Sequence, residues 1–275
     1  MANHVKGKRT LITGAASGFG RLLCAELTNS GAHVLGVDID ADGLGSLADE
    51  LGGELLTRRT DVTDAADFAA AANVLYKAHG GVDVLVNNAG TMPLAFHADH
   101  KDALAAWNRC IDVNIRGVMN GIAAVHDLMI EQGQGHIVNL SSIYGNFPVV
   151  GAGVYGASKA AVNFLSESLR VESQGKIRVT LVKPTGVPGT NLGTGIINPE
   201  ALIGILGQNG PEYMAKLQAR AAGTAPAAAA DPESSQYAAL DPEFIVAAIV
   251  HAIDQPQGVA VGDITVRATG DGYIL

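Results

Sequence analysis

The sequence carries little charge, and none of it is gathered into a basic run. Charged residues make up 16% of the 275 residues, and the formal net charge is −9. Nucleic acids and anionic membrane surfaces are bound mainly through clustered lysine and arginine side chains. We therefore expect neither nucleic acid nor a membrane as a partner.

Features of disulfide-rich, metal-binding and membrane-spanning proteins are also missing. Cys24 and Cys110, the two cysteines, each lie in an apolar helical pattern, which indicates buried thiols in a reducing compartment. The eight histidines are scattered without metal-ligand spacing, so no metal is predicted. The N-terminal stretch lacks the apolar core of a signal peptide, and no run of about 18 apolar residues predicts a membrane span. These absences favour a cytoplasmic protein acting on a small molecule.

What the chain does contain is an alternation of short apolar runs and helical patterns. The apolar runs are continuous, as is typical of strands covered by helices on both faces. Residues 1–275 are therefore predicted to form one dinucleotide-binding and catalytic domain, an α/β Rossmann-type doubly wound parallel sheet of about seven strands. The expected strands lie in residues 9–13, 32–40, 54–61, 82–90, 135–142, 176–184 and 258–269.

The alternation breaks after Pro184. Residues 185–240 are rich in glycine, alanine and proline, with helical patches near 200–207 and 212–221. A long insertion in such a domain is either a disordered linker or a lid over the site. The apolar surface of Tyr213, Met214 and residues 201–206 favours a mobile substrate lid that precedes the last helix.

A glycine-rich segment between the first strand and the first helix indicates a nucleotide site. Gly14 permits a tight turn, Gly18 lets the backbone approach a pyrophosphate, and Gly20 lets the helix pack closely. The phosphates would meet the unpaired N–H groups at the start of the helix. The spacing is G-x-x-x-G-x-G, and ordinary turn glycines are the alternative interpretation.

Asp38 ends the second strand, eighteen residues after Gly20. A carboxylate there is expected to hydrogen-bond the adenosine ribose and repel a 2′-phosphate. Ile39 and Asp40 follow it, and Ser17 occupies the other place for a phosphate-binding cation. This pattern predicts NAD (NAD⁺/NADH) in preference to NADP, although Asp38 would serve equally to cap the next turn.

Tyr155 and Lys159 begin an apolar helical pattern four residues apart, so both lie on one face of the helix. A free tyrosine has a pKa near ~10. An ammonium ~4 Å away contributes about 4 kcal/mol at an effective dielectric constant of ~20, or roughly three pKa units. Ser142, after the apolar run that ends at Leu140, would present a hydroxyl beside the phenol. The alternative is a surface tyrosine–lysine pair on an amphipathic helix.

Six motifs together resemble the short-chain dehydrogenase/reductase family, in its ordinary-length, NAD-preferring branch, over about residues 6–190. They are TGAASGFG from Thr13, Asp61-Val62, NNAG at 87–90, Asn114, Ser142 and YGASK at 155–159. The resemblance implies an oxidoreductase, and often a tetramer or dimer assembled through two long helices and the last strand. One departure is Thr185, which follows Pro184 where the family usually has glycine, with Thr190 one position late.

The resemblance also implies roles. Tyr155 is the expected acid or base, Lys159 lowers its pKa and holds the nicotinamide ribose, Ser142 orients the substrate carbonyl, and Asn114 binds a water. An amide bonded to backbone is the alternative for Asn114. The residues expected to bind the cofactor are Gly14, Ser17, Gly18, Phe19, Gly20, Asp38, Asp61, Val62, Asn88, Ala89, Gly90, Tyr155, Lys159, Val187 and Thr190.

Besides Ser142 and Tyr155, the substrate is expected to contact Met92, Tyr144 and Phe147. These walls are mostly apolar and lack arginine or lysine. We therefore expect an uncharged, bulky secondary alcohol or its ketone, interconverted by hydride transfer. A steroid or cyclic terpene alcohol is a narrower alternative, and a catalytically silent NAD-binding regulator is an alternative of another class.

Overall fold

Seven parallel strands form one sheet in the computed structural model, which describes residues 3–274. The strand order is β3-β2-β1-β4-β5-β6-β7, and every neighbouring pair is parallel. The predicted Rossmann-type sheet is confirmed. The strands are β1 (Arg9–Thr13), β2 (His33–Asp38), β3 (Leu56–Arg59), β4 (Val84–Asn87), β5 (Gly135–Leu140), β6 (Ile177–Pro184) and β7 (Asp263–Val266).

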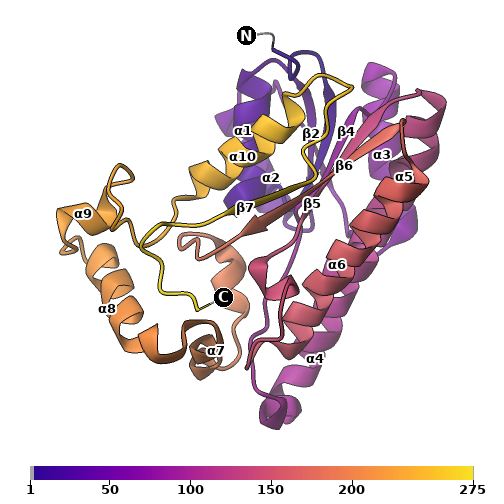
Figure 1. Cartoon of the computed structure of the whole chain (residues 1–275). Helices are drawn as coiled ribbons and strands as arrows, with labels where there is room; N and C mark the ends of the chain where they lie inside the picture. Colours follow the sequence, from indigo (N-terminus) through magenta and orange to yellow (C-terminus); the bar gives the residue numbers. More distant parts are fainter. Residues whose placement is uncertain (1–2, 275) are drawn as a thin grey trace.

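Helices cover both faces of this sheet (Figure 1). On one face, α1, α2 and α10 contribute buried side chains such as Leu23, Leu47 and Ile249 to one core cluster. On the other, α3 and α5 contribute Phe68 and Met129 to a second cluster. The bounds are α1 (Gly18–Asn29), α2 (Ala41–Glu50), α3 (Ala65–His79), α4 (His100–Ile111), α5 (Gly117–Glu131), α6 (Gly153–Glu172) and α10 (Pro242–Ile253).

Local side-chain chemistry sets several helix boundaries. The carboxylate of Asp40 accepts the N–H of Gly43 at the start of α2, and Asp64 caps α3 in the same way. Gly80 ends α3 with φ of 80°, a left-handed conformation that glycine adopts without strain. The long helical pattern expected over 101–131 is present, but a π-helical turn, η2 (Asp112–Arg116), separates α4 from α5. Such turns are frequent at functional sites.

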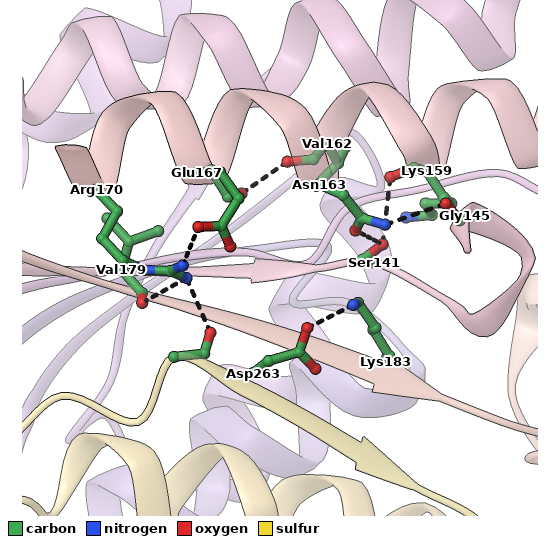
Figure 2. A network of polar contacts seen from close by, with 12 residues as sticks. Ser141, Gly145, Lys159, Val162, Asn163, Glu167, Arg170, Val179, Lys183 and Asp263 are labelled. Carbon is green, nitrogen blue, oxygen red and sulfur yellow. Dashed lines mark hydrogen bonds and ion pairs between the residues drawn. The ribbon is translucent and has the colours of Figure 1, made fainter. Parts of the chain in front are cut away.

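Polar contacts fix α6 against the sheet (Figure 2). The hydroxyl of Ser141, just after β5, donates to the amide oxygen of Asn163, whose Nδ2 donates to the carbonyl of Gly145. Farther along the helix, Arg170 donates to the carbonyl of Val179 in β6. These contacts hold α6, which carries the expected catalytic pair, at a defined position over the end of β5.

Residues 185–240 lie outside the sheet and its helical layers, beside the end of the chain (Figure 1). Side chains of this segment, among them Ala201, Ile205 and Tyr213, pack in one buried cluster with Tyr144 and Tyr155. That this segment moves as a lid stays a prediction. Its elements are η4 (Asn191–Gly195), η5 (Pro199–Leu202), α7 (Ile203–Leu206), η6 (Gly207–Asn209), α8 (Gly210–Ala221) and α9 (Ala227–Ala230); the other 3-10 turns are η1 (His97–Asp99) and η3 (Ile143–Gly145).

Within residues 3–274, no helix is both long enough and apolar enough to cross a bilayer.

Candidate active site

A cavity of about 590 Å³ opens at the carboxyl ends of the strands. The strand order reverses between β1 and β4, so the connections that follow these strands diverge and leave a crevice. Most of the residues predicted from the sequence line it. They are Gly14, Ser17, Gly18, Phe19, Asp38, Asp61, Val62, Asn88, Ala89, Gly90, Met92, Ser142, Tyr144, Tyr155, Lys159, Val187 and Thr190.

Three predicted residues are not part of the lining. Gly20 is packed behind it, where a Cβ would lie 2.0 Å from the carbonyl oxygen of Gly14, so this glycine allows α1 to approach the loop as expected. Asn114 is fully buried beneath the loop that follows β4. Phe147 does not reach the cavity: its side chain is 58% exposed, because the loop after η3 turns it toward solvent. The structure therefore does not bring Phe147 together with the other residues expected to contact substrate.

The glycine loop has the form of a phosphate cradle. Gly14 and Gly18 have φ of 70° and 52°, and a Cβ on Gly14 would lie 2.8 Å from Nδ2 of Asn88. Ser17, at the N-cap of α1, makes no side-chain capping hydrogen bond. The first N–H groups of the helix therefore remain open to a phosphate, which the helix dipole also favours. The residues present fit a dinucleotide.

Thr13 joins this loop to the segment after β4, a role that the sequence reading missed. Its Oγ1 accepts the N–H groups of Asn88 and Ala89, both at 3.0 Å. In return, Nδ2 of Asn88 donates to the carbonyl of Thr13 at 2.8 Å. The position of a threonine directly before the glycine motif was the available signal.

Tyr155, Ser142 and Lys159 converge deep in the cavity, and all three are buried. Nζ of Lys159 lies 5.8 Å from the centroid of the Tyr155 ring and donates to the carbonyl of Leu140 at 2.7 Å. The Ser142 hydroxyl acts on the phenol of Tyr155 and lowers its pKa. The site thus presents two hydroxyl groups and one ammonium in a desolvated pocket.

The expected lowering of the Tyr155 pKa by Lys159 is not found. Burial raises the pKa of Tyr155 above the ordinary value, although the hydroxyl of Ser142 opposes this change. Burial also lowers the pKa of Lys159 to about 8. Desolvation outweighs the attraction assumed from the sequence, because removing a charge from water is costly for both partners. At neutral pH, the phenol is protonated.

Ser141 and Ser142 have different surroundings, although both are next to the site. The Ser141 hydroxyl donates to Asn163 and to the carbonyl of Lys159, so it is turned toward α6 (Figure 2). The hydroxyl of Ser142 accepts the N–H of Tyr144 at 3.3 Å and remains beside Tyr155. This arrangement leaves Ser142 as the serine available to a substrate oxygen.

Asn114 holds the loop after β4. Its Oδ1 accepts the N–H of Thr91 at 2.9 Å, and its Nδ2 donates to the carbonyl of Thr91 and to the hydroxyl of Ser158, each at 3.0 Å. A Cβ on Gly90 would lie 3.3 Å from Oδ1 of Asn114 and 3.6 Å from Nζ of Lys159. Asn114 therefore fixes backbone beside the lysine, and glycine at position 90 makes room for both groups.

Asp38 reaches the cavity, but backbone groups engage both oxygens of its carboxylate. They accept the N–H groups of Ala16 and Asp40, each at 3.0 Å. Nearby, hydrogen bonds from the backbone and hydroxyl of Thr63 lower the pKa of Asp61, as do the charges of Arg109 and Arg59. Cationic side chains are thus close to the end of the cavity that holds Asp38 and Asp61.

The other end of the cavity is largely apolar. Among the described residues that line the whole cavity, the lysines and arginines are Lys159 and Arg109, and Arg109 lies near Asp61 at the first end. Residues of the 185–240 segment, whose apolar side chains predicted a substrate lid, complete this wall. A residue of the C-terminal segment, which sequence reasoning did not assign to the site, joins them. These added residues are Ile196, Leu202, Tyr213, Leu217 and Tyr273.

Comparison with known proteins identifies the family. The family model described as short chain dehydrogenase matches residues 8–200. An uncharacterised oxidoreductase of Staphylococcus saprophyticus is 32% identical over 96% of this chain and 97% of its own. The NADP-dependent 3-hydroxy acid dehydrogenase YdfG of Salmonella typhi is 37% identical over 66% of this chain and 73% of its own. The closed form of serine dehydrogenase complexed with NADP⁺ superposes with a TM-score of 0.76 and 29% identity, covering 94% of this chain and 93% of that chain.

These similarities overturn the preference for NAD that was inferred from Asp38. Similar proteins are named NADP-dependent, and a similar structure contains NADP⁺. The prediction from Asp38 is wrong, and its hydrogen bonds offer a physical reason. Because Ala16 and Asp40 donate to both of its oxygens, the carboxylate stabilises the turn, as the alternative interpretation proposed. This chain is an oxidoreductase of the short-chain dehydrogenase family.

Proposed function

We propose that the protein interconverts a bulky, uncharged secondary alcohol and its ketone with NADP(H) as the hydride carrier. The observation that carries this proposal is the burial of Ser142, Tyr155 and Lys159 at the junction of the dinucleotide cradle and an apolar chamber. Two relatives are named for serine or 3-hydroxy acids, which carry carboxylates. The substrate end of this cavity offers no arginine or lysine besides Lys159 among the described lining, which supports a neutral substrate here.

The side chains have separable tasks in this reaction. Bound NADP(H) supplies or receives the hydride. Ser142 donates a hydrogen bond to the substrate oxygen and positions it, while Tyr155 transfers a proton to or from the same oxygen. The phenol, protonated because burial raises its pKa, is ready to give its proton to a ketone. Lys159, anchored to the carbonyl of Leu140, places its ammonium beside the ring and stabilises the phenolate that forms.

Cofactor choice is proposed to depend on the adenosine end of the cavity, which is the end that holds Asp38 and Asp61. Asp38 on β2 and Arg59 on β3 are paired in the register of the two strands, so the arginine side chain starts from the backbone position next to Asp38. Arg59 is exposed at the end of its strand and is the cation that we assign to the 2′-phosphate. Arg59→Ala should reduce kcat/KM for NADPH about tenfold or more and leave the value for NADH nearly unchanged. Equal losses with both cofactors would contradict this assignment.

The test of the proposed reaction is NADPH oxidation with matched panels of neutral ketones and keto acids. Tyr155→Phe should lower kcat by roughly a hundredfold or more, because the proton donor is lost while the ring and its packing remain. Binding of NADPH, measured by its fluorescence, should change little. Tyr76→Phe, the same substitution at a half-exposed site on α3, is the control. Near-normal turnover by Tyr155→Phe, or a clear preference for keto acids, would refute the proposal.

We also propose a homo-oligomer, formed through the outer face of α4 and α6, which pack against each other (Figure 1). Leu104 on α4 and Phe164 and Val171 on α6 are 56%, 77% and 74% exposed, a large apolar surface for adjacent helices. Phe164→Glu should shift the protein toward monomer in sedimentation velocity while its circular dichroism is retained. An unchanged sedimentation coefficient in wild type and variant would exclude this face as the interface.

A further inference from the structure

Two tyrosines far apart in the sequence meet at the substrate end of the cavity. Tyr213 lies on α8 and Tyr273 lies in the segment after β7, and their ring centroids are 5.4 Å apart. Both line the same cavity as Ser142 and Tyr155. Tyr144, whose ring centroid is 5.5 Å from that of Tyr155, packs in the same cluster. A substrate held at Ser142 and Tyr155 therefore has phenol groups within the same chamber.

The hydroxyl of Tyr213 is buried without a satisfactory partner. The residue is 3% exposed, and its Oη makes no hydrogen bond of ordinary length and angle with any part of the chain that the structure describes. The phenol of Tyr273 is close enough to lower the pKa of Tyr213 through a side-chain interaction, but the two groups do not meet the length and angle of an ordinary hydrogen bond. Because buried polar groups are normally hydrogen-bonded, an unsatisfied hydroxyl at a cavity wall needs an explanation. A polar group of the ligand would supply the missing partner.

The chain holds Tyr273 in place through several contacts. Its N–H donates to Oδ1 of Asp271, which is paired with Arg267. The N–H of the next residue, Ile274, donates to the carbonyl of Ile205 in α7. The Tyr273 ring lies so close to Gly186, in the loop after β6, that a Cβ there would be 2.4 Å from the ring. The phenol of Tyr273 is thus held between α7 and the loop after β6.

The charges around the two phenols favour a neutral partner. Burial raises the pKa of Tyr213 and of Tyr273, and the carboxylate of Asp271 raises both further, so the two hydroxyls stay protonated and can donate. Among the described residues lining the cavity, Lys159 is committed to Leu140 and Arg109 lies at the adenosine end. An anionic group beside Tyr213 would meet the carboxylate of Asp271, and the guanidinium groups nearby already pair with carboxylates, Arg220 with Asp241 and Arg267 with Asp271.

We propose that Tyr213 and Tyr273 form a subsite that hydrogen-bonds a second, uncharged oxygen of the substrate. This inference rests on the proposed function and narrows the substrate class to neutral ketones or alcohols that carry a distal hydroxyl, ether or carbonyl oxygen. The reacting oxygen occupies Ser142 and Tyr155, and the distal oxygen accepts a hydrogen bond from Tyr213. Tyr213 is then a residue that determines specificity and has no part in proton transfer.

The experiment compares benzylacetone with its para-hydroxy and para-carboxy derivatives, in wild type and in Tyr213→Phe. In the wild type, kcat/KM should be about tenfold or more higher for the para-hydroxy ketone than for benzylacetone, and lowest for the para-carboxy ketone. Tyr213→Phe should remove the advantage of the hydroxyl while leaving benzylacetone within about twofold. Tyr76→Phe should leave all three values unchanged. The melting temperature of Tyr213→Phe should not fall, since the lost hydroxyl makes no hydrogen bond of ordinary geometry with the described residues.

Other results would overturn the subsite. These are a wild type without preference for the para-hydroxy ketone, a preference that survives Tyr213→Phe, or an equal loss with both ketones. If none of the ketones is turned over, the proposed function fails. The subsite is then tested separately by measuring the affinity of each ketone by calorimetry with NADPH present. A hydroxyl-dependent affinity that Tyr213→Phe removes would then support it, and equal affinities for benzylacetone and its para-hydroxy derivative would refute it.

Discussion

Thr10 and Thr13 lie on the same buried strand, and replacing each with valine is expected to affect stability in different ways. Both side chains are almost fully buried, at 0% and 1% exposure, so each substitution removes a buried hydroxyl from the same strand. Valine keeps the size and β-branching of threonine, which suits a strand. The difference lies in what each hydroxyl contacts.

Oγ1 of Thr13 accepts two backbone N–H groups, from Asn88 and Ala89. A buried donor left without its partner costs about 1–3 kcal/mol. These two residues are only partly buried, so water recovers part of the loss, and the lower end applies to each. Thr13→Val should therefore lower the free energy of unfolding by about 2 kcal/mol. Oγ1 of Thr10 has no hydrogen-bond partner among the described residues, so Thr10→Val should be neutral or stabilising by up to about 1 kcal/mol.

Urea unfolding followed by the fluorescence of Trp107 measures both effects, because this is the single tryptophan and it is buried in α4. Thr13→Val should also weaken NADPH binding, since Asn88 and Ala89 line the cavity, whereas Thr10→Val should not. Equal destabilisation by the two variants would refute the assignment of the Thr13 hydrogen bonds. A stable Thr13→Val with normal NADPH affinity would do the same.

Two other predictions concern packing and pH. Gly121→Ala should destabilise the protein by about 1–3 kcal/mol in urea unfolding, because the new Cβ would lie 2.3 Å from Oδ1 of Asn87; Gly45→Ala, in α2 with nothing within 4 Å, should instead stabilise it by about 0.5–1 kcal/mol. Burial, with the charge of Arg178, lowers the pKa of His136 to about 3, below the ordinary 6.5. The unfolded chain therefore binds the extra proton first, and stability present above pH 6.5 should decline as the pH falls toward 3. His136→Gln should flatten this decline in urea midpoints measured across that range; an unchanged pH profile would exclude His136 as its source.

The sequence was sufficient for the sheet and for the form of the glycine loop because both depend on local patterns. Continuous apolar runs predict strands buried on both faces, and the glycines at 14, 18 and 20 mark a turn between strand and helix. Four-residue spacing likewise placed Tyr155 and Lys159 on one face of α6. The choice of Ser142 as the serine beside Tyr155 came from spacing within the family resemblance, and the hydrogen bonds of Ser141 are compatible with it.

Tertiary structure decided what depends on burial and on contacts between distant segments. The pKa of Tyr155 is raised because the folded pocket removes water, an effect that the spacing to Lys159 does not contain. The role of the Asp38 carboxylate in stabilising a turn depended on which backbone groups donate to its oxygens. Tyr213 and Tyr273 meet because the lid segment and the C-terminal segment fold over the same cavity, while Phe147, closer in sequence to Ser142, points to solvent. Local spacing determined that Tyr155 and Lys159 share one helix face, and only the folding of distant segments onto one cavity decided the shape and polarity of the pocket around them.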